Sequence, residues 1–148
     1  KAGDVQVMSA GTGVVHSEFN LEDEETNLYQ IWMFPNKKNV KPRWDAKEFP
    51  KEPVTDKLKA LVTGFNDPDS DSLKIYQDTT IFAGRMNKGT IIKQNIKQQA
   101  YVLCSYGKLC LNDTELNKGD GAEIVNLQEI SITAQEDCEV LLIDLPKY

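Results

Sequence analysis

Hydrophobic and polar residues alternate in short runs along most of the 148-residue chain, and this two-residue period is typical of β-strands. Residues that favour turns separate the runs, as at 86–89, 106–107 and 118–121. We therefore predict an all-β sandwich or barrel of many short strands. The predicted strands are residues 5–15, 28–34, 58–65, 73–77, 80–83, 90–96, 100–105, 108–111, 122–125, 130–133 and 139–144.

Three segments depart from simple alternation. Residues 28–34 are largely apolar on both faces, which predicts a strand that is covered on both sides. Residues 36–57 carry three prolines and several lysines, so we predict a linker without regular structure, held to the surface by Trp44 and Phe49. Residues 66–72 resemble the start of a calcium loop, but they lack its glycine and its bidentate glutamate, and we predict a polar turn.

The chain also repeats itself in outline. Residues 1–4 (Lys-Ala-Gly-Asp) return as residues 117–120 (Asn-Lys-Gly-Asp), and the run 28–31 with Pro35 returns as 140–143 with Pro146. The copy that spans residues 58–146 has a whole set of predicted strands, whereas the first copy has only its last few. This order predicts two similar units, the first of them incomplete.

Composition and charge restrict the classes of function. The net charge is −6, with 23 acidic residues against 17 basic ones, which argues against nucleic-acid binding. No apolar run is long enough to span a bilayer, so we expect no membrane association. Three cysteines with no short-spaced pair, Cys104, Cys110 and Cys138, indicate reduced thiols, and we expect a cytoplasmic protein.

The candidate chemistry lies in residues 11–20, Gly-Thr-Gly-Val-Val-His-Ser-Glu-Phe-Asn. This stretch holds His16, the only histidine, and Glu18 two residues later. On a strand these two side chains would project from one face, and an imidazole with a carboxylate suits zinc, iron, manganese or nickel. The alternative is a hydrogen-bonded or merely solvated pair. Gly11 and Gly13 allow a tight bend just before His16.

These residues resemble the second sequence motif of the cupins. Gly3, then Ser9 in the place of proline, and Gly11 follow the motif's spacing, and His16 and Asn20 complete it after a gap two residues longer than usual. The longer gap and the run Leu-Tyr-Gln-Ile-Trp-Met-Phe-Pro at 28–35 are similar to the pirin branch of the cupins. From Phe65 onward the chain resembles the second half of bacterial pirin-like proteins with quercetinase activity.

The resemblance implies a bicupin of the double-stranded β-helix or jelly-roll type, truncated at its N-terminus. Residues 1–35 would be the C-terminal remainder of the first, metal-binding cupin, 36–57 a linker, and 58–148 a second, metal-free cupin. In the family three histidines and one glutamate bind a metal, and His16 and Glu18 match the third histidine and the glutamate. The second unit has Ile130-Ser-Ile132 at the corresponding place and no histidine, so it would be a structural barrel or a metal-free cup.

Two functions from different classes follow from the resemblance. In the first, the full-length parent is a quercetin 2,3-dioxygenase with one divalent metal, iron foremost and zinc, manganese, nickel or copper as alternatives, a flavonol-like aromatic substrate, and Glu18 as catalytic base. In the second, it is a pirin-like regulator or metal or redox sensor that binds a protein partner. A storage-type cupin without a site is disfavoured by His16 and Glu18. We expect this chain alone to bind no metal tightly, to be inactive, and to form a dimer or strand-exchanged oligomer.

Overall fold

Strands account for the regular secondary structure in the part of the chain that the computed structural model describes, residues 3–49, 51–69, 71–97 and 99–146. The all-β prediction is thus confirmed. Within those ranges, no helix is long and apolar enough to cross a membrane. The strands are β1 (Asp4–Ser9), β2 (Arg43–Glu48), β3 (Lys59–Gly64), β4 (Leu73–Ile75), β5 (Thr80–Met86), β6 (Ile91–Asn95), β7 (Gln99–Tyr106), β8 (Lys108–Leu111), β9 (Thr114–Asn117), β10 (Gly121–Val125), β11 (Glu129–Ala134) and β12 (Cys138–Leu145).

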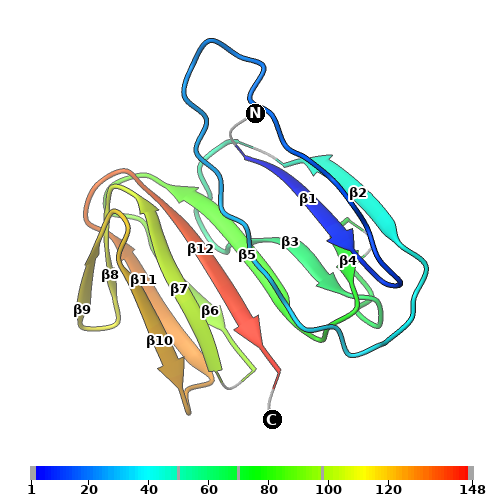
Figure 1. The fold of residues 1–148 in the computed structure, drawn as a ribbon. Coiled ribbons are helices and arrows are strands. Elements are labelled where there is room, and N and C mark those ends of the chain that lie inside the picture. The colour runs from blue at the N-terminus through cyan, green and yellow to red at the C-terminus, as the bar shows by residue number, and fades with distance from the viewer. Residues whose placement is uncertain (1–2, 50, 70, 98, 147–148) are drawn as a thin grey trace.

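Two sheets built from β3 to β12 form the larger part of the molecule (Figure 1). One sheet has the order β10-β7-β12-β5-β3-β4, and the other has the order β6-β11-β8-β9. Because successive side chains of a strand point to opposite faces, every second residue of β12 enters the space between the sheets, as Val140 and Leu142 do. Ile92, Val102 and Ile132 from three other strands meet them there and are fully buried.

A two-stranded ribbon covers the outer face of the six-stranded sheet. β1 pairs antiparallel with β2, from Asp4 opposite Glu48 to Ser9 opposite Arg43. Val5 and Val7 turn toward the sheet and join an apolar cluster with residues of β3, β4 and β5. Gln6 and Met8 therefore lie on the opposite face of the ribbon, together with Trp44, which pairs with Met8.

The ribbon corrects the prediction that residues 36–57 lack regular structure. Residues 43–48 form β2, because Pro42 comes just before the strand and leaves its backbone N–H groups free to pair with β1. Phe49 is buried in the apolar cluster as expected, whereas Trp44 is mostly exposed. Pro50, which belongs to the predicted linker, lies outside the described residues.

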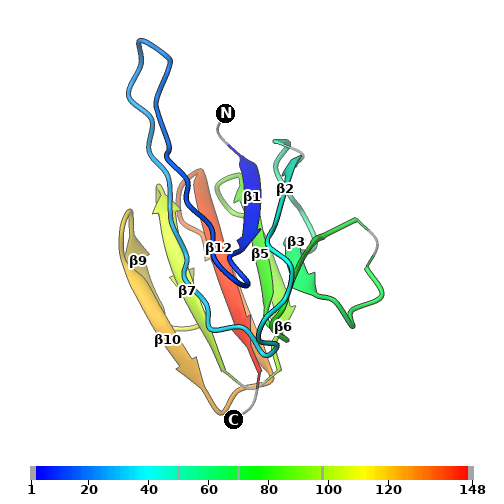
Figure 2. The ribbon, with the colours of Figure 1, turned by 45° about the vertical axis from the view of Figure 1, so that its right-hand side comes forward.

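Residues 14–35, the arm, leave the end of the ribbon, reach beyond the two sheets and double back toward β2 (Figures 1 and 2). The prediction of a strand over 5–15 is right only as far as Ser9, and the predicted strand over 28–34 is wrong. Extended backbone becomes a strand only when a neighbour pairs with it, and among the described residues none pairs with the arm. Trp32 and Phe34, predicted to be covered, are 90% and 93% exposed.

The polar turn predicted between β3 and β4 is organised by Lys74. Its ammonium group donates to Thr63 Oγ1 at 2.8 Å and to the carbonyl oxygens of Asp67 and Asp69. The Asp67 carboxylate in turn accepts the backbone N–H of Asp69 at 2.9 Å. Thr63 is buried and also contacts the Ser72 hydroxyl at 2.6 Å. Backbone carbonyl groups of this turn are thus bound by a lysine of the chain itself.

We expect Lys74→Met to destabilise the fold by about 1–3 kcal/mol, because it removes the charged donor that Thr63 Oγ1 shares with the carbonyl groups of Asp67 and Asp69. Urea denaturation measures this free energy. Lys93→Met on the exposed side of β6 is the matched control and should change stability by less than about 0.5 kcal/mol. Equal effects of the two substitutions would contradict the role given to Lys74.

Candidate functional site

A glycine bend sets the direction of the segment that carries His16 and Glu18. Gly11 has φ of +55° and Gly13 has φ of +132°, values that side chains with a Cβ rarely adopt. A Cβ on Gly11 would lie only 2.1 Å from the Val40 carbonyl oxygen. The Gly13 N–H donates to the Ala10 carbonyl at 2.8 Å and closes the turn. The bend predicted from the two glycines is confirmed.

The Glu18 carboxylate is held by two amide side chains. Gln6 Nε2 donates to Glu18 Oε1 at 2.8 Å, and Gln30 Nε2 donates to Glu18 Oε2 at 2.7 Å. The indole N–H of Trp44 donates to Gln6 Oε1 at 3.3 Å. We call these four residues the carboxylate network. It joins the outgoing branch of the arm, which carries Glu18, and the returning branch, which carries Gln30, to both strands of the ribbon.

His16 lies on an exposed, irregular part of the arm. The prediction that it occupies a strand with Glu18 on the same face is therefore wrong, because no strand in the described part of the chain pairs with this segment. The structure places Glu18 within the network and leaves His16 in solvent. His16 and Glu18 are assigned as metal ligands by the family resemblance alone.

The donors present are suitable in kind but not in number. An imidazole and a carboxylate are both common ligands of zinc, iron and nickel, and a metal site normally has three or four protein ligands. Over the described ranges, no group of three or more His, Cys, Asp or Glu side chains is placed to hold a metal ion. Residues 3–49, 51–69, 71–97 and 99–146 by themselves therefore supply only half of such a donor set.

The interior of the second unit is a packed core. Ile130 and Ile132, at the positions that correspond to His16 and Glu18, are 1% and 0% exposed and face the apolar cluster between the sheets. The sequence left open whether this unit is a structural barrel or a binding cup. Apolar side chains from both sheets fill the space, which favours the structural barrel.

Burial also makes the thiols of the two inner cysteines unreactive. Cys104 and Cys138 are buried free thiols, and Cys110 is partly exposed. Burial raises the pKa of Cys138 to about 11 and also raises the pKa of Cys104. Both stay protonated at neutral pH, and a protonated thiol is a poor nucleophile and a poor metal ligand.

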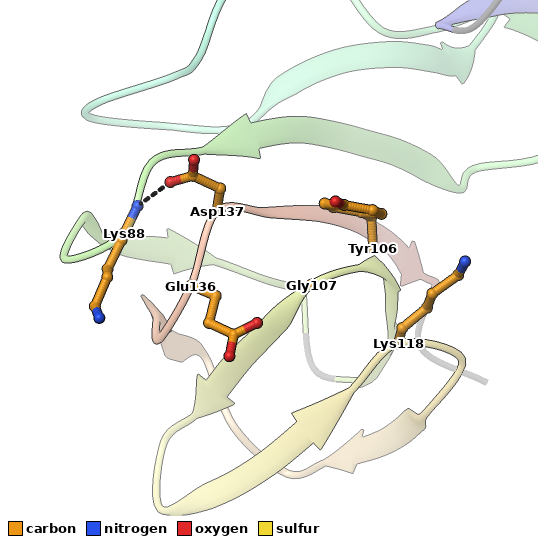
Figure 3. Close-up of a pocket in the computed structure, with 6 residues that line it drawn as sticks. All are labelled: Lys88, Tyr106, Gly107, Lys118, Glu136 and Asp137. Atoms are coloured by element: carbon orange, nitrogen blue, oxygen red, sulfur yellow. Dashed lines mark hydrogen bonds between the residues drawn. The ribbon is translucent and has the colours of Figure 1, made fainter.

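A shallow pocket of about 550 Å³ lies at one end of the second unit (Figure 3). Asp137 accepts the backbone N–H of Lys88 at 2.8 Å, and the Lys118 ammonium is 6.0 Å from the centre of the Tyr106 ring. Figure 3 shows the Lys88 side chain directed away from the other lining residues. The charges are of both signs and face solvent, and no nucleophile is paired with a base there, so the pocket presents no catalytic arrangement.

Asp144 is a buried acid at the end of β12, where its Oδ1 accepts the backbone N–H of Lys97 at 2.9 Å. Burial raises the pKa of Asp144, and the hydrogen bond and charge of Lys97 offset part of this rise. A carboxyl group whose pKa is higher in the folded state destabilises that state when it ionises. Stability is therefore lost as pH rises from the ordinary aspartate pKa through the raised one.

We expect Asp144→Asn to gain stability relative to the parent chain as pH increases over that window. The amide keeps an acceptor for Lys97 and cannot ionise. Below about pH 3 the difference between the two proteins should be nearly constant, because the Asp144 carboxyl is then mostly protonated in both the folded and the unfolded state. Denaturant unfolding at a series of pH values measures the difference, and a difference that falls with rising pH would refute the assignment.

Two parts of the chain match known protein families. Residues 62–145 match the model of the quercetinase C-terminal cupin domain, so the second unit is a cupin and the predicted fold is confirmed. Residues 1–33 match the pirin model. The chain belongs to the pirin family, as the resemblance in residues 3–35 and from Phe65 onward predicted.

Relatives align along nearly the whole chain. A pirin-like protein from Caulobacter vibrioides is 40% identical over 97% of this chain and 62% of its own length. A quercetin 2,3-dioxygenase from Escherichia coli K12 is 35% identical over 98% of this chain and 62% of its own length. The chain spans about three fifths of the length of the curated relatives it matches.

Solved structures agree with these relatives. The crystal structure of YhhW from Escherichia coli superposes with a TM-score of 0.88 at 33% identity, over 99% of this chain and 62% of that one. Bacterial pirin YhhW in complex with nickel(II) superposes with a TM-score of 0.85 at 31% identity, over 99% of this chain and 63% of that one.

Sequence reasoning identified Glu18 but missed Gln6, Gln30 and Trp44 around it. A signal for Gln30 was present, since it is the polar residue in the otherwise apolar series 28, 30, 32 and 34. Gln6 likewise stands between Val5 and Val7. The acceptor of these amides depends on the fold of the arm, and the alternation of apolar and polar residues cannot predict that fold.

Proposed function

We propose that His16 and Glu18 are two ligands of a metal centre in a pirin-type quercetin 2,3-dioxygenase, whose other ligands belong to a longer chain beginning upstream of Lys1. The observation that carries this proposal is the restrained Glu18 carboxylate, with an amide donor on each oxygen. The family membership supports it, as do the quercetin 2,3-dioxygenase and the nickel(II)-bound pirin among the relatives. Residues 1–35 would be the remainder of the metal-binding cupin, 36–57 the linker that contributes β2, and 58–148 the second, metal-free cupin.

The metal, when bound, would act as a Lewis acid on a flavonol oxygen. The residues of this chain have separate tasks in the proposal. His16 and Glu18 would hold the metal through an imidazole nitrogen and a carboxylate oxygen, and Glu18 would also accept the proton of the flavonol hydroxyl. The second unit would supply a rigid support, because the outer face of its six-stranded sheet packs against the ribbon through the apolar cluster of Val7 and Leu61. Iron is our first candidate metal, and zinc, manganese, nickel and copper are the alternatives.

A pirin-like regulator or metal or redox sensor that binds a protein partner is the second candidate function. The exposed apolar side chains of the arm favour it, because surfaces of this kind often form protein interfaces. Oxygen uptake with quercetin by the metal-loaded, full-length parent separates the two functions. Uptake that depends on Glu18 supports the dioxygenase, and no uptake by a fully loaded protein supports the regulator.

We expect the 148-residue chain to retain no stoichiometric transition metal after dialysis against a chelator, because two of four ligands are lacking. The full-length parent should retain one metal per chain, and His16→Ala or Glu18→Ala should each weaken binding by at least about 10-fold, since even changes outside the ligand shell cost 10- to 100-fold. Elemental analysis measures the metal content. One equivalent on the 148-residue chain would overturn this expectation.

We also propose that this chain associates with itself through the arm. Trp32 and Phe34 are almost fully exposed, and neither strand of the ribbon pairs with a third strand among the described residues. Open strand edges and apolar side chains recruit other chains. A dimer or a strand-exchanged oligomer would cover both.

Sedimentation at increasing concentration should therefore show species larger than a monomer. Trp32→Ser combined with Phe34→Ser should shift the distribution toward the monomer, because it removes the largest exposed apolar groups of the arm. Ile91→Ser is a matched control, since Ile91 is exposed but lies on β6 of the second unit. A monomer at every concentration would contradict the proposal.

A further inference from the structure

We propose that Gln6 and Gln30 are positioning residues that fix the Glu18 carboxylate and leave part of its lone-pair surface open to a divalent cation. This inference rests on the function proposed above. It goes further by giving a task to residues outside the assigned ligands. The carboxylate network is its physical basis.

The two bonds restrain the carboxylate from both sides. Gln6 and Gln30 lie twelve residues before and twelve residues after Glu18, on the ribbon and on the returning branch of the arm. Each of the two amides takes a different oxygen, so both the position and the rotation of the carboxylate are restrained. An ionised carboxylate offers about four acceptor sites, and the two amides occupy one on each oxygen. The remaining lone pairs are free to bind a cation.

The chemical type of the two partners supports a cation rather than a closed ion pair. A carboxamide donates a hydrogen bond without carrying charge. Arginine or lysine at either position would place a positive charge a few ångströms from the incoming metal and would repel it. Gln6 and Gln30 thus orient the Glu18 charge without neutralising it.

Trp44 determines which way the Gln6 amide faces. An indole N–H can only donate, so its contact with Gln6 Oε1 directs Gln6 Nε2 toward Glu18. Trp44 lies on β2 and Gln6 on β1, and the pairing of these strands holds the two side chains on one face. Donation therefore runs in one direction, from Trp44 to Gln6 to Glu18.

The competing explanation is that the bonds only fasten the arm to the ribbon. The two explanations differ in what removal of a glutamine changes. A fastening role would alter the arm's mobility and stability together, whereas a positioning role would lower cation affinity while the unfolding midpoint stays nearly constant.

The test uses the 148-residue chain and cobalt(II) as the only probe. Paramagnetic shifts and broadening of the His16 ring protons detect weak binding. We expect Gln6→Met and Gln30→Met each to raise the apparent dissociation constant about 10-fold, the lower end of the range for groups that orient a ligand. Gln94→Met is the matched control, because Gln94 on β6 donates to the backbone carbonyl of Asn95. It should leave cobalt binding unchanged, and thermal unfolding of each variant should match the parent.

A second measurement needs no metal. In the parent chain the side-chain amide resonances of Gln6 and Gln30 should move when Glu18 is replaced by alanine, while that of Gln94 should not. If the Gln6 and Gln30 resonances stay in place, the carboxylate network does not form and the inference is overturned.

The possible failures can be told apart. If cobalt binds the parent and His16→Ala abolishes binding, but the glutamine variants bind equally well, the positioning inference alone fails. Lower cobalt affinity that comes with an equal loss of thermal stability also overturns it, in favour of a fastening role. If the parent shows no binding that depends on His16, the ligand assignment of the proposed function fails, and the open cation position fails with it.

Discussion

Extended backbone must find a neighbouring strand for its hydrogen bonds, and this requirement governs the whole structure. In the second unit every strand from β3 to β12 has such a neighbour, and the paired sheets bury an apolar core between them. Among the described residues before β3, only β1 and β2 pair, and they pair with each other. Residues 28–34 of the arm have the composition of a strand, but no strand among the described residues pairs with the arm, and it stays irregular and, apart from Met33, exposed. The same chain therefore contains one completed sandwich and one open ribbon.

Local pattern was sufficient wherever alternation and turn residues were clear, even for strands whose partners are far away in the sequence, such as β5 and β12. Strands β5 to β8 and β10 to β12 were predicted within a few residues, because alternation and turn residues determine them. β9 was missed, since Leu116 is its only apolar residue. β2 was missed because the prolines on either side of it indicated irregular structure and concealed the strand between them. The strand predicted over 28–34 failed for the opposite reason, as an apolar pattern cannot show whether a partner exists.

The candidate site divides in the same way. Residue type and spacing marked His16, Glu18 and the glycine bend, because those features reside in a few consecutive residues. The surroundings of Glu18 depend on three segments that meet only in the folded chain: the ribbon strand with Gln6, the neighbouring strand with Trp44, and the returning branch with Gln30. Sequence reasoning therefore supplied the charged group and omitted the neutral residues that hold it.

The ribbon has a consequence for how such a protein can change over evolutionary time. Its two faces have different neighbours. Val7 lies in the apolar cluster between the ribbon and the six-stranded sheet, and Gln6 lies on the side of the Glu18 carboxylate. A change on one face of the ribbon therefore affects the other face. A larger residue at Val7 would push the ribbon away from the sheet and shift Gln6, although the substitution itself is on the opposite face from Glu18. Substitutions at the residues of β3, β4 and β5 that pack against Val7 would act on Gln6 in the same way, so compensating pairs of changes should connect this apolar cluster to the carboxylate side of the ribbon.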